Sequence, residues 1–347
     1  MRSCLCVLLV GIGCSRKPEL ARQSWDTMGT YATITAPGKD RARLAPYANT
    51  AMAVFQDVDD AMSLFKPDSE LSRLNRAAGT GAVTLSAPTL AVLQHALSYA
   101  EVSGGCFDPT VGPLMLLWGF HGGIKPDKPI EEDRIQSVKQ IVGYRHIIVS
   151  NDTGTVRLDK PGMVLDLGGV AKGYAVDVAY ERLRALGAKD LMVDLGGNIR
   201  CGGSPRGKEP WIVGVRNPFD RREIVGTLRL TNGMAVATSG NYERFVTING
   251  KRYAHIMDPR AGRPVTGMAA VTVVAREAVH ADGVSSMLFV LGIEAAKPVL
   301  GLLKDREAMF IPDEQPMRIV ITPGLKECFT PGAPWKDCVS VMEIPGP

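Results

Sequence analysis

Residues 165–174 (LDLGGVAKGY) place the tightest constraint on how this chain can fold. An apolar stretch ends at Asp166, the glycines Gly168 and Gly169 follow, and Lys172 falls in the first turn of the helix expected next. Glycines let a ligand approach the backbone, a helix start presents free N–H groups to an anion, and lysine adds a point charge suited to phosphate. The spacing is not that of a Walker A loop. Taken alone, the segment fits a phosphate site and a structural turn with a solvated lysine equally well.

A second glycine pair, Gly196 and Gly197, follows Asp194 in the same order. Such a pair most often marks a strand end that needs positive φ, so this motif by itself favours a structural turn.

His255 lies in residues 253–260 (YAHIMDPR), on an expected strand just before the Asp258-Pro259 turn. A histidine can act as general base on a hydroxyl group. A hydrogen-bonded core position is the commoner fate of a single histidine, and the local sequence leaves both interpretations open.

Asp282 and Ser286 are four residues apart in a segment with a helical pattern, so they share one helix face. A carboxylate and a hydroxyl, with room for a backbone carbonyl, phosphate oxygens and water, suit Mg²⁺ better than a soft metal. The alternative is that Asp282 caps the helix N-terminus, which the local sequence favours.

Antiparallel hairpins and packed helices alternate along the chain, which indicates an α+β or mixed α/β fold with antiparallel-rich sheets rather than a doubly wound parallel sheet. Asn249-Gly250 is typical of a two-residue hairpin turn. Strands are expected over residues 31–36, 146–150, 155–158, 164–167, 191–195, 211–216, 224–230, 245–248, 253–256, 270–275, 308–312 and 318–322. Helices are expected over residues 54–65, from Ser86 to the glycines at 104–105, and over 170–186, 281–291 and 294–304, and residues 121–135 should form a polar connector.

The first fourteen residues form an expected export signal. Arg2 is followed by the apolar residues 5–13 and then by Cys14. This apolar stretch is too short for a membrane span of about 20 residues, and it resembles a secretory signal. Cys14 is the candidate lipidation site of a lipoprotein, although Gly11 stands where leucine is usual, and a plain signal peptide is the alternative. We expect a periplasmic protein anchored to a membrane, the inner one by preference, through an N-terminal lipid.

The charge pattern argues against a polyanionic partner. The net charge is +4, and no run of five like charges occurs, so no nucleic-acid footprint is present. Export also makes disulfides chemically possible, and Cys328 and Cys338 in the C-terminal segment 326–347 could pair or remain free.

Taken in order, the motifs resemble those of the ApbE family of FAD:protein FMN transferases. No motif is decisive alone, but eight occur in the expected order between residues 25 and 325. They are residues 28–30 (MGT), 63–71 (SLFKPDSEL), 105–118 (GCFDPTVGPLMLLW), 166–174, 194–198, 238–242 (TSGNY), 255–259 and 281–286. The resemblance implies one FAD-binding transferase domain over residues 15–325, with two lobes as an option.

The resemblance also implies which residues form the site. The residues lining the FAD site would be Met28, Phe65, Cys106, Phe107, Asp108, Asp166, Lys172 and Ile256. The Mg²⁺ ligands would be Asp282, Ser286, the neighbouring Ser285 and the backbone carbonyl of Gly169, and His255 would be the base, with Lys172 and Asp282 as its catalytic partners. Phe65 stands where the family often has tyrosine, and Ser286 replaces the usual threonine.

The implied reaction transfers the FMN half of FAD to a Ser or Thr hydroxyl of an exported flavoprotein subunit and releases AMP. Such acceptors carry an Asp-x-x-Ser/Thr-Gly-Ala-Ser/Thr pattern. Two alternatives remain open from the sequence. One is a Mg²⁺-dependent FAD pyrophosphatase, with water in place of the acceptor, and the other is a lipoprotein that binds FAD without turnover.

Overall fold

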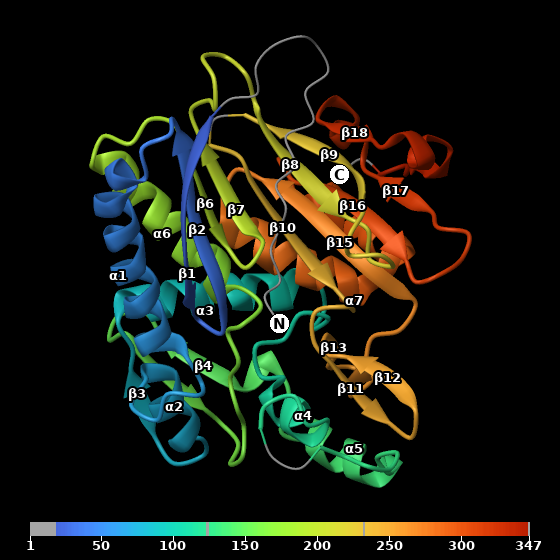
Figure 1. The fold of residues 1–347 in the computed structure, drawn as a ribbon. Coiled ribbons are helices and arrows are strands. Elements are labelled where there is room, and N and C mark those ends of the chain that lie inside the picture. Colours follow the sequence, from blue (N-terminus) through green and yellow to red (C-terminus); the bar gives the residue numbers. More distant parts are fainter. Residues whose placement is uncertain (1–18, 123–124, 232, 346–347) are drawn as a thin grey trace.

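The computed structural model describes residues 19–122, 125–231 and 233–345, and its centre is one large β-sheet (Figure 1). The signal segment and Cys14 lie outside the described residues. Within the described ranges, nine strands form this sheet in the order β1-β2-β6-β7-β10-β15-β16-β17-β19, and only β17 and β19 pair in parallel. The strands are β1 (Leu20–Thr27), β2 (Thr30–Pro37), β6 (Leu191–Leu195), β7 (Asn198–Gly202), β10 (Ala235–Gly240), β15 (Met268–Ala275), β16 (Glu307–Pro312), β17 (Ile319–Ile321) and β19 (Val339–Val341).

The central sheet is covered on both faces. Helices pack on one face, and a small sheet with the order β18-β9-β8 packs on the other. Strand β15 illustrates the consequence, because Val271 and Val273 belong to the helix-side core while Ala270 and Val274 belong to the other core. A strand buried on both faces is apolar throughout rather than alternating. The strands of the small sheet are β8 (Trp211–Arg216), β9 (Ile224–Leu230) and β18 (Phe329–Pro331).

The helix layer consists mainly of α1 (Ala45–Met62), α3 (Ala87–Val102), α6 (Ala171–Ala185) and α7 (Ala278–Leu302). Figure 1 shows α7 behind β10 and β15. Gly292 interrupts α7 with a φ of 71°, which explains why the sequence pattern predicts two successive helices there. By length and apolar composition α7 could span a membrane, but half of its most apolar window is buried, as in the core helix of a globular protein.

A smaller core lies at the lower end of the molecule in Figure 1. Helices α4 (Gly112–Leu117) and α5 (Glu132–Lys139) pack there against the hairpin of β11 (Phe245–Ile248) and β12 (Lys251–Ala254). Trp118 Nε1 donates a hydrogen bond to the Gly262 carbonyl at 3.0 Å. The hairpin of β11 and β12 precedes His255 in the chain, and β13 (Met257–Asp258) and Gly262 follow it. This core therefore anchors the chain on both sides of His255.

Short elements complete the described chain. Helix α2 (Glu70–Arg76) packs beside a sheet of β3 (Ala82–Thr84), β5 (Thr155–Leu158) and β4 (Ile147–Ser150), and β13 pairs with β14 (Arg263–Pro264). Four 3₁₀ helices cover Arg41–Leu44, Tyr144–His146, Pro323–Glu327 and Ala333–Cys338. The C-terminal segment therefore adds strands β18 and β19 to the sheets. Cys328 and Cys338 are both free.

Several local predictions are confirmed, including the hairpin at Asn249-Gly250. Asn249 and Gly250 have φ values of 49° and 75°, as the two-residue turn requires. The boundaries of two elements are wrong. Helix α1 ends at Met62, since Ser63 is extended, so Phe65 lies in a turn. Strand β12 ends at Ala254, which leaves His255 and Ile256 in the loop beyond it.

Two other expectations are wrong for non-local reasons. Residues 164–167 do not form a strand, because the Asn75 side chain takes the place of a strand partner. Its Oδ1 accepts from the Leu165 N–H at 2.7 Å, and its Nδ2 donates to the Leu165 carbonyl at 3.0 Å. The connector at 121–135 already contains the start of α5, where Ile135 is fully buried.

The N-terminus of α7 is capped by a carboxylate from α6. Asp177 accepts hydrogen bonds from the backbone N–H groups of Ala278 and Val279, both at 2.8 Å. The first N–H groups of a helix have no partner within the helix, and the side chain of Glu277, at the N-cap position, provides none. Arg200 Nη1 pairs with the same carboxylate at 2.9 Å. Asp177 therefore fixes the position of α7 against α6.

We expect Asp177→Ala to lower the free energy of unfolding by about 2–4 kcal/mol, because it removes a helix cap and leaves Arg200 without its buried partner. Urea denaturation followed by circular dichroism measures this change. Asp57→Ala is the matched control, because Asp57 also faces an arginine of α6 but is exposed, 3.9 Å from Arg182. The control should change stability by less than about 1 kcal/mol. Equal effects of the two variants would contradict the capping role.

Candidate functional site

The glycine turn at the start of α6 is rigidly held. The Asp166 N–H donates to the Pro109 carbonyl, and the Gly168 N–H donates to Asp166 Oδ1, both at 2.7 Å. Lys172 Nζ reaches back to the Gly168 carbonyl at 2.9 Å. The turn thus gathers an ammonium group and the N-terminus of a helix at one point, which is a suitable place for an anion.

Asp282 is buried opposite this turn. It lies in the second turn of α7, four residues after the helix begins, so the expected N-capping alternative is wrong. The Gly173 N–H donates to Asp282 Oδ2 at 2.9 Å, while Oδ1 has Lys172 Nζ at 4.0 Å, beyond hydrogen-bonding distance. Burial raises the pKa of Asp282, and the charge of Lys172 and the Gly173 hydrogen bond offset only part of that rise. The negative charge of this carboxylate is incompletely compensated by the protein.

Three serine hydroxyls continue the oxygen-rich surface next to Asp282. Ser239 on β10 lies 2.9 Å from the Ser285 hydroxyl and 3.1 Å from the Ser286 hydroxyl. Ser285 also donates to the Asp282 carbonyl at 2.9 Å. Ser239 is a site residue that the sequence analysis missed, although it lies inside the motif at residues 238–242.

Gly169 lies next to these hydroxyl groups, between Ser286 and the Phe107 ring. A Cβ atom on Gly169 would stand 3.7 Å from Ser286 Oγ and 3.1 Å from the Phe107 ring. The structure therefore brings together Gly169, Asp282, Ser285 and Ser286, as predicted for the metal ligands. Within the described ranges, no cluster of three His, Cys, Asp or Glu side chains could hold a metal. One carboxylate with neutral oxygens fits a hard cation such as Mg²⁺.

His255 lies in the loop after β12, anchored by its N–H, which donates to the Arg244 carbonyl at 3.1 Å. Burial, followed by the charges of Arg244 and Lys172, lowers the pKa of His255 to about 4. Its Nδ1 is buried and lacks a hydrogen-bond partner within the described part of the chain. The imidazole is therefore neutral at pH 7 and has an unused nitrogen, as a proton acceptor requires.

His121, in the expected polar connector, contacts two of the predicted site residues. His121 Nε2 lies 2.6 Å from Asp166 Oδ2, and its ring stands edge-on to the Phe65 ring with centroids 5.5 Å apart. Burial acts to raise the pKa of Asp166, but the hydrogen bond with His121, together with the Gly168 N–H and the charge of Lys172, holds that pKa below its ordinary value. Phe65 is 63% exposed, which is high for a large aromatic residue.

The remaining predicted FAD-lining residues differ in how free they are to bind a ligand. Phe107 packs against Tyr99, with ring centroids 5.7 Å apart, and lies against Gly169. Asp108 is buried, and its carboxylate accepts bonds from Thr110 and from the Tyr144 N–H, so both oxygens have protein partners. Burial raises the pKa of the Cys106 thiol.

Met28 and Ile256 occupy the edges of this region. Met28 has a φ of 48° in the turn between β1 and β2, and a Cβ on the next residue, Gly29, would lie 3.7 Å from Arg244 Nη2. The Ile256 carbonyl accepts from the Val265 N–H at 2.8 Å. A direct contact of these two residues with FAD stays a prediction.

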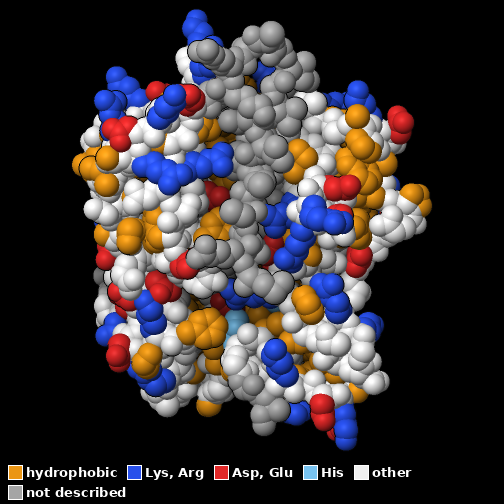
Figure 2. All heavy atoms as spheres, viewed as in Figure 1, with side chains coloured by type: hydrophobic (Ala, Val, Ile, Leu, Met, Phe, Trp, Pro, Cys, Tyr) orange, Lys and Arg blue, Asp and Glu red, His pale blue; other side chains and the backbone are white. Residues whose placement is uncertain are grey.

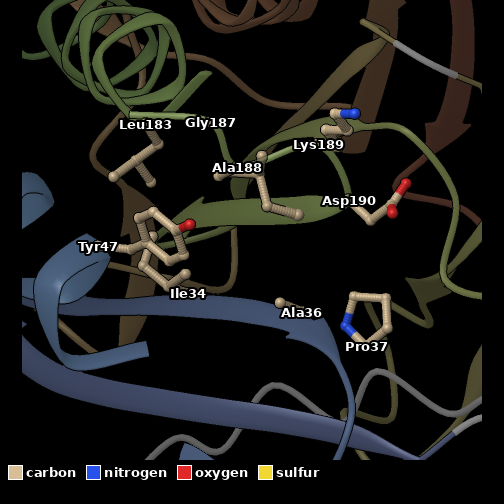
Figure 3. A pocket seen from close by; sticks show the side chains of 10 residues that line it. Ile34, Ala36, Pro37, Tyr47, Leu183, Gly187, Ala188, Lys189 and Asp190 are labelled. Atoms are coloured by element: carbon tan, nitrogen blue, oxygen red, sulfur yellow. The ribbon is translucent and has the colours of Figure 1, made fainter. Parts of the chain in front are cut away.

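Two cavities lie elsewhere. Figure 3 shows one of about 290 Å³ lined by Tyr47, Leu183 and Asp190 at the C-terminal end of α6. Lys172 lies at the other end of this fifteen-residue helix, about 20 Å away at 1.5 Å per residue. A second cavity of about 270 Å³ lies at the kink of α7 near Gly292. Neither includes a predicted site residue.

Comparison with known proteins places the chain in a family. The family model described as the ApbE family matches residues 28–310. The chain belongs to the ApbE family. The FAD:protein FMN transferase of Vibrio cholerae is 33% identical over 297 residues, which cover 85% of this chain and 88% of that protein. The FAD:protein FMN transferase of Haemophilus influenzae is 34% identical over 294 residues, or 82% and 85% of the two chains.

Solved structures of the ApbE family share the fold. The flavin transferase ApbE from Vibrio cholerae superposes with a TM-score of 0.80 at 30% identity, covering 90% of this chain and 100% of that one. The ApbE protein from Thermotoga maritima gives a TM-score of 0.77 at 28% identity, covering 92% and 99%. The predicted family and the antiparallel-rich α+β fold are thereby confirmed.

We expect Asp282→Asn to abolish tight binding of Mn²⁺, used as a spectroscopic substitute for Mg²⁺ in electron paramagnetic resonance titrations, because the variant removes the only carboxylate of the ligand set. Ser286→Ala should weaken binding by about tenfold, the scale of one lost ligand contact of about 1.4 kcal/mol. Ser285→Ala should have a smaller effect, because the Ser285 hydroxyl already donates a hydrogen bond to the backbone carbonyl of Asp282. A larger loss in Ser285→Ala than in Ser286→Ala would contradict this assignment.

Proposed function

We propose that this protein transfers the FMN half of FAD to a Ser or Thr hydroxyl of another protein, with Mg²⁺ bound and AMP released. The relatives that match most of the chain are named FAD:protein FMN transferase, which supports flavin transfer to a protein. The observation that carries the finer proposal is the buried, incompletely compensated carboxylate of Asp282 beside Ser286 and the Gly168-Gly169 turn.

The charge distribution suits a pyrophosphate. Lys172 and the N-terminus of α6 present positive charge at the glycine turn, and Arg244 lies beside Gly29 and His255. In Figure 2, Lys and Arg side chains are spread over the visible face, and some of them lie directly above a histidine and a group of hydrophobic side chains. Lys172, Arg244 and the N-terminus of α6 would hold the two phosphates of FAD and orient the bond that breaks.

In the proposed step, the acceptor oxygen attacks the phosphorus of the FMN half. One P–O bond forms, the P–O bond to the bridging oxygen breaks, and AMP leaves with that electron pair. The hydroxyl proton passes to the neutral imidazole of His255. Lys172 and the positive end of the α6 dipole stabilise the charge that grows on the phosphate oxygens. Bound Mg²⁺ would supply further positive charge to those oxygens.

Asp282, Ser285, Ser286 and the Gly169 carbonyl are the residues that would hold the metal. The same residues would also serve hydrolysis of FAD if water replaced the acceptor. The names of the relatives favour transfer to a protein. Because the same residues could serve both reactions, a test must measure both the flavin-labelled acceptor and free FMN.

We also propose that the protein works outside the cytoplasm, in the periplasm, attached to a membrane through lipid on Cys14. This rests on the signal pattern of residues 1–14. It fits an acceptor that is itself an exported flavoprotein subunit.

We expect intact mass spectrometry to detect FMN addition to an acceptor protein bearing the Asp-x-x-Ser/Thr-Gly-Ala-Ser/Thr pattern, with one AMP released per flavin attached. Asp282→Ala should reduce the rate at least 100-fold, because phosphate charge stabilisation is worth about 3 kcal/mol or more. Asp57→Ala is the control with normal activity. Release of free FMN without acceptor labelling would identify a pyrophosphatase, and retention of FAD without AMP would identify a carrier.

We expect kcat/KM for FAD to stay level from pH 8 to about pH 5 and to fall below that, because protonated His255 cannot accept the hydroxyl proton. The inflection should follow the free-enzyme pKa of about 4. A lowered histidine pKa also means that the folded state loses stability as the pH falls below about 6.5, the ordinary histidine value. Circular dichroism must therefore confirm folding at each pH. An inflection near pH 6.5 in the folded protein would contradict a buried, neutral base.

A further inference from the structure

His121 is a buried histidine with half of its hydrogen-bonding capacity unused. Only 7% of its side chain is exposed, and its Nδ1 has no hydrogen-bond partner within the described part of the chain. Leaving a buried polar atom unpaired costs free energy, so such an atom in a native structure needs an explanation. An incoming ligand atom is one explanation, and the surroundings of His121 favour it.

The orientation of the His121 ring is fixed by Asp166. The carboxylate contacts Nε2 at 2.6 Å, and its own position is set by the Gly168 N–H on Oδ1 and by the Pro109 carbonyl on its backbone. An ionised carboxylate only accepts hydrogen bonds, so the proton of this contact lies on Nε2. With that one proton on Nε2, the ring presents Nδ1 as a hydrogen-bond acceptor whose direction is set by the contact with Asp166.

Phe65 supplies a flat surface next to this acceptor. Its ring is exposed, and the turn that carries it is held by Lys66, which pairs with Asp59 and Asp60, and by Ser69, which donates to the Ser63 carbonyl at 2.6 Å. An exposed aromatic ring in a rigid turn is suited to stacking against a planar ligand.

His121 therefore lies between an aromatic surface and the glycine turn, because its partner Asp166 is two residues from Gly168. We propose that His121 is a binding residue of the FAD site, whose Nδ1 accepts a hydrogen bond from an N–H group of the heteroaromatic ring that stacks on Phe65. This inference rests on the proposed function, since it takes FAD as the ligand. The ring with the N–H group is the isoalloxazine or the adenine. On this view Asp166 acts on FAD through His121 and is a positioning residue.

Equilibrium titration of FAD, followed by flavin fluorescence, tests the proposal without acceptor and with EDTA, so that no turnover occurs. We expect His121→Ala to raise the Kd for FAD about tenfold, the scale of one hydrogen bond. Phe65→Leu should raise it similarly. His95→Ala is the matched control, a partly buried histidine on α3 that contacts His280 and Tyr99, and it should stay within twofold of the wild type. An unchanged Kd in a folded His121→Ala protein overturns the proposal.

Competition by FMN and by AMP assigns the ring. If His121→Ala weakens FMN but not AMP, the isoalloxazine stacks on Phe65, and the reverse result assigns the adenine. Equal weakening of both would mean a general loss of structure and would overturn a specific contact.

A measurement on the wild-type protein covers the case in which the variant does not fold. The ¹⁵N resonance of His121 Nδ1 should be that of an unprotonated nitrogen and should shift when FAD is added. A resonance that FAD leaves unmoved overturns the proposal. Because no acceptor is present, failure of the transferase assignment would leave these binding results unaffected, and the two outcomes are distinguishable.

Discussion

The joint between α6 and α7 is the contact on which the rest of the site depends. The Gly173 N–H meets the Asp282 carboxylate at 2.9 Å, and a Cβ on Gly173 would come within 2.3 Å of the Ala278 carbonyl oxygen. Any side chain at this position would push the helices apart. Asp177 closes the same joint one turn further along α6 by capping α7. These contacts hold the glycine turn before α6 close to Asp282, Ser285 and Ser286 on α7.

The site is also organised by unequal charge environments. Asp166 is held below its ordinary pKa by His121, Asp282 is held above it by burial, and His255 is kept neutral with a pKa of about 4. The two carboxylates therefore differ in pKa although they are the same type of residue, because their surroundings differ. Such differences suit the groups of one site to different chemical roles. The negative charge of Asp282 is only partly compensated by the protein, which suits a bound metal cation next to a pyrophosphate. The unpartnered nitrogen of His255 suits the proton of an acceptor hydroxyl.

What could be predicted locally was predicted well. The hairpin turn at Asn249-Gly250, the apolar run of β15 and the glycine turn before α6 each follow from the conformational preferences of a few adjacent residues. The region around residues 164–167 was misassigned because an apolar run resembles a strand whatever its partner is, and here the partner is the side chain of Asn75. His121 and Ser239 were missed for a related reason, since neither has a local pattern that distinguishes it from a loop or strand residue.

The sequence by itself determined the family, the antiparallel-rich fold and the chemical types available to the site, because these depend on short-range patterns and on the order of motifs. Only the tertiary structure decided which groups meet. The contact of Asp166 with His121 spans 45 residues and that of Gly173 with Asp282 spans 109. Burial, the largest cause of the lowered pKa of His255, arises only when the chain packs. Burial and distant contacts are properties of the packed chain, so no local segment encodes them.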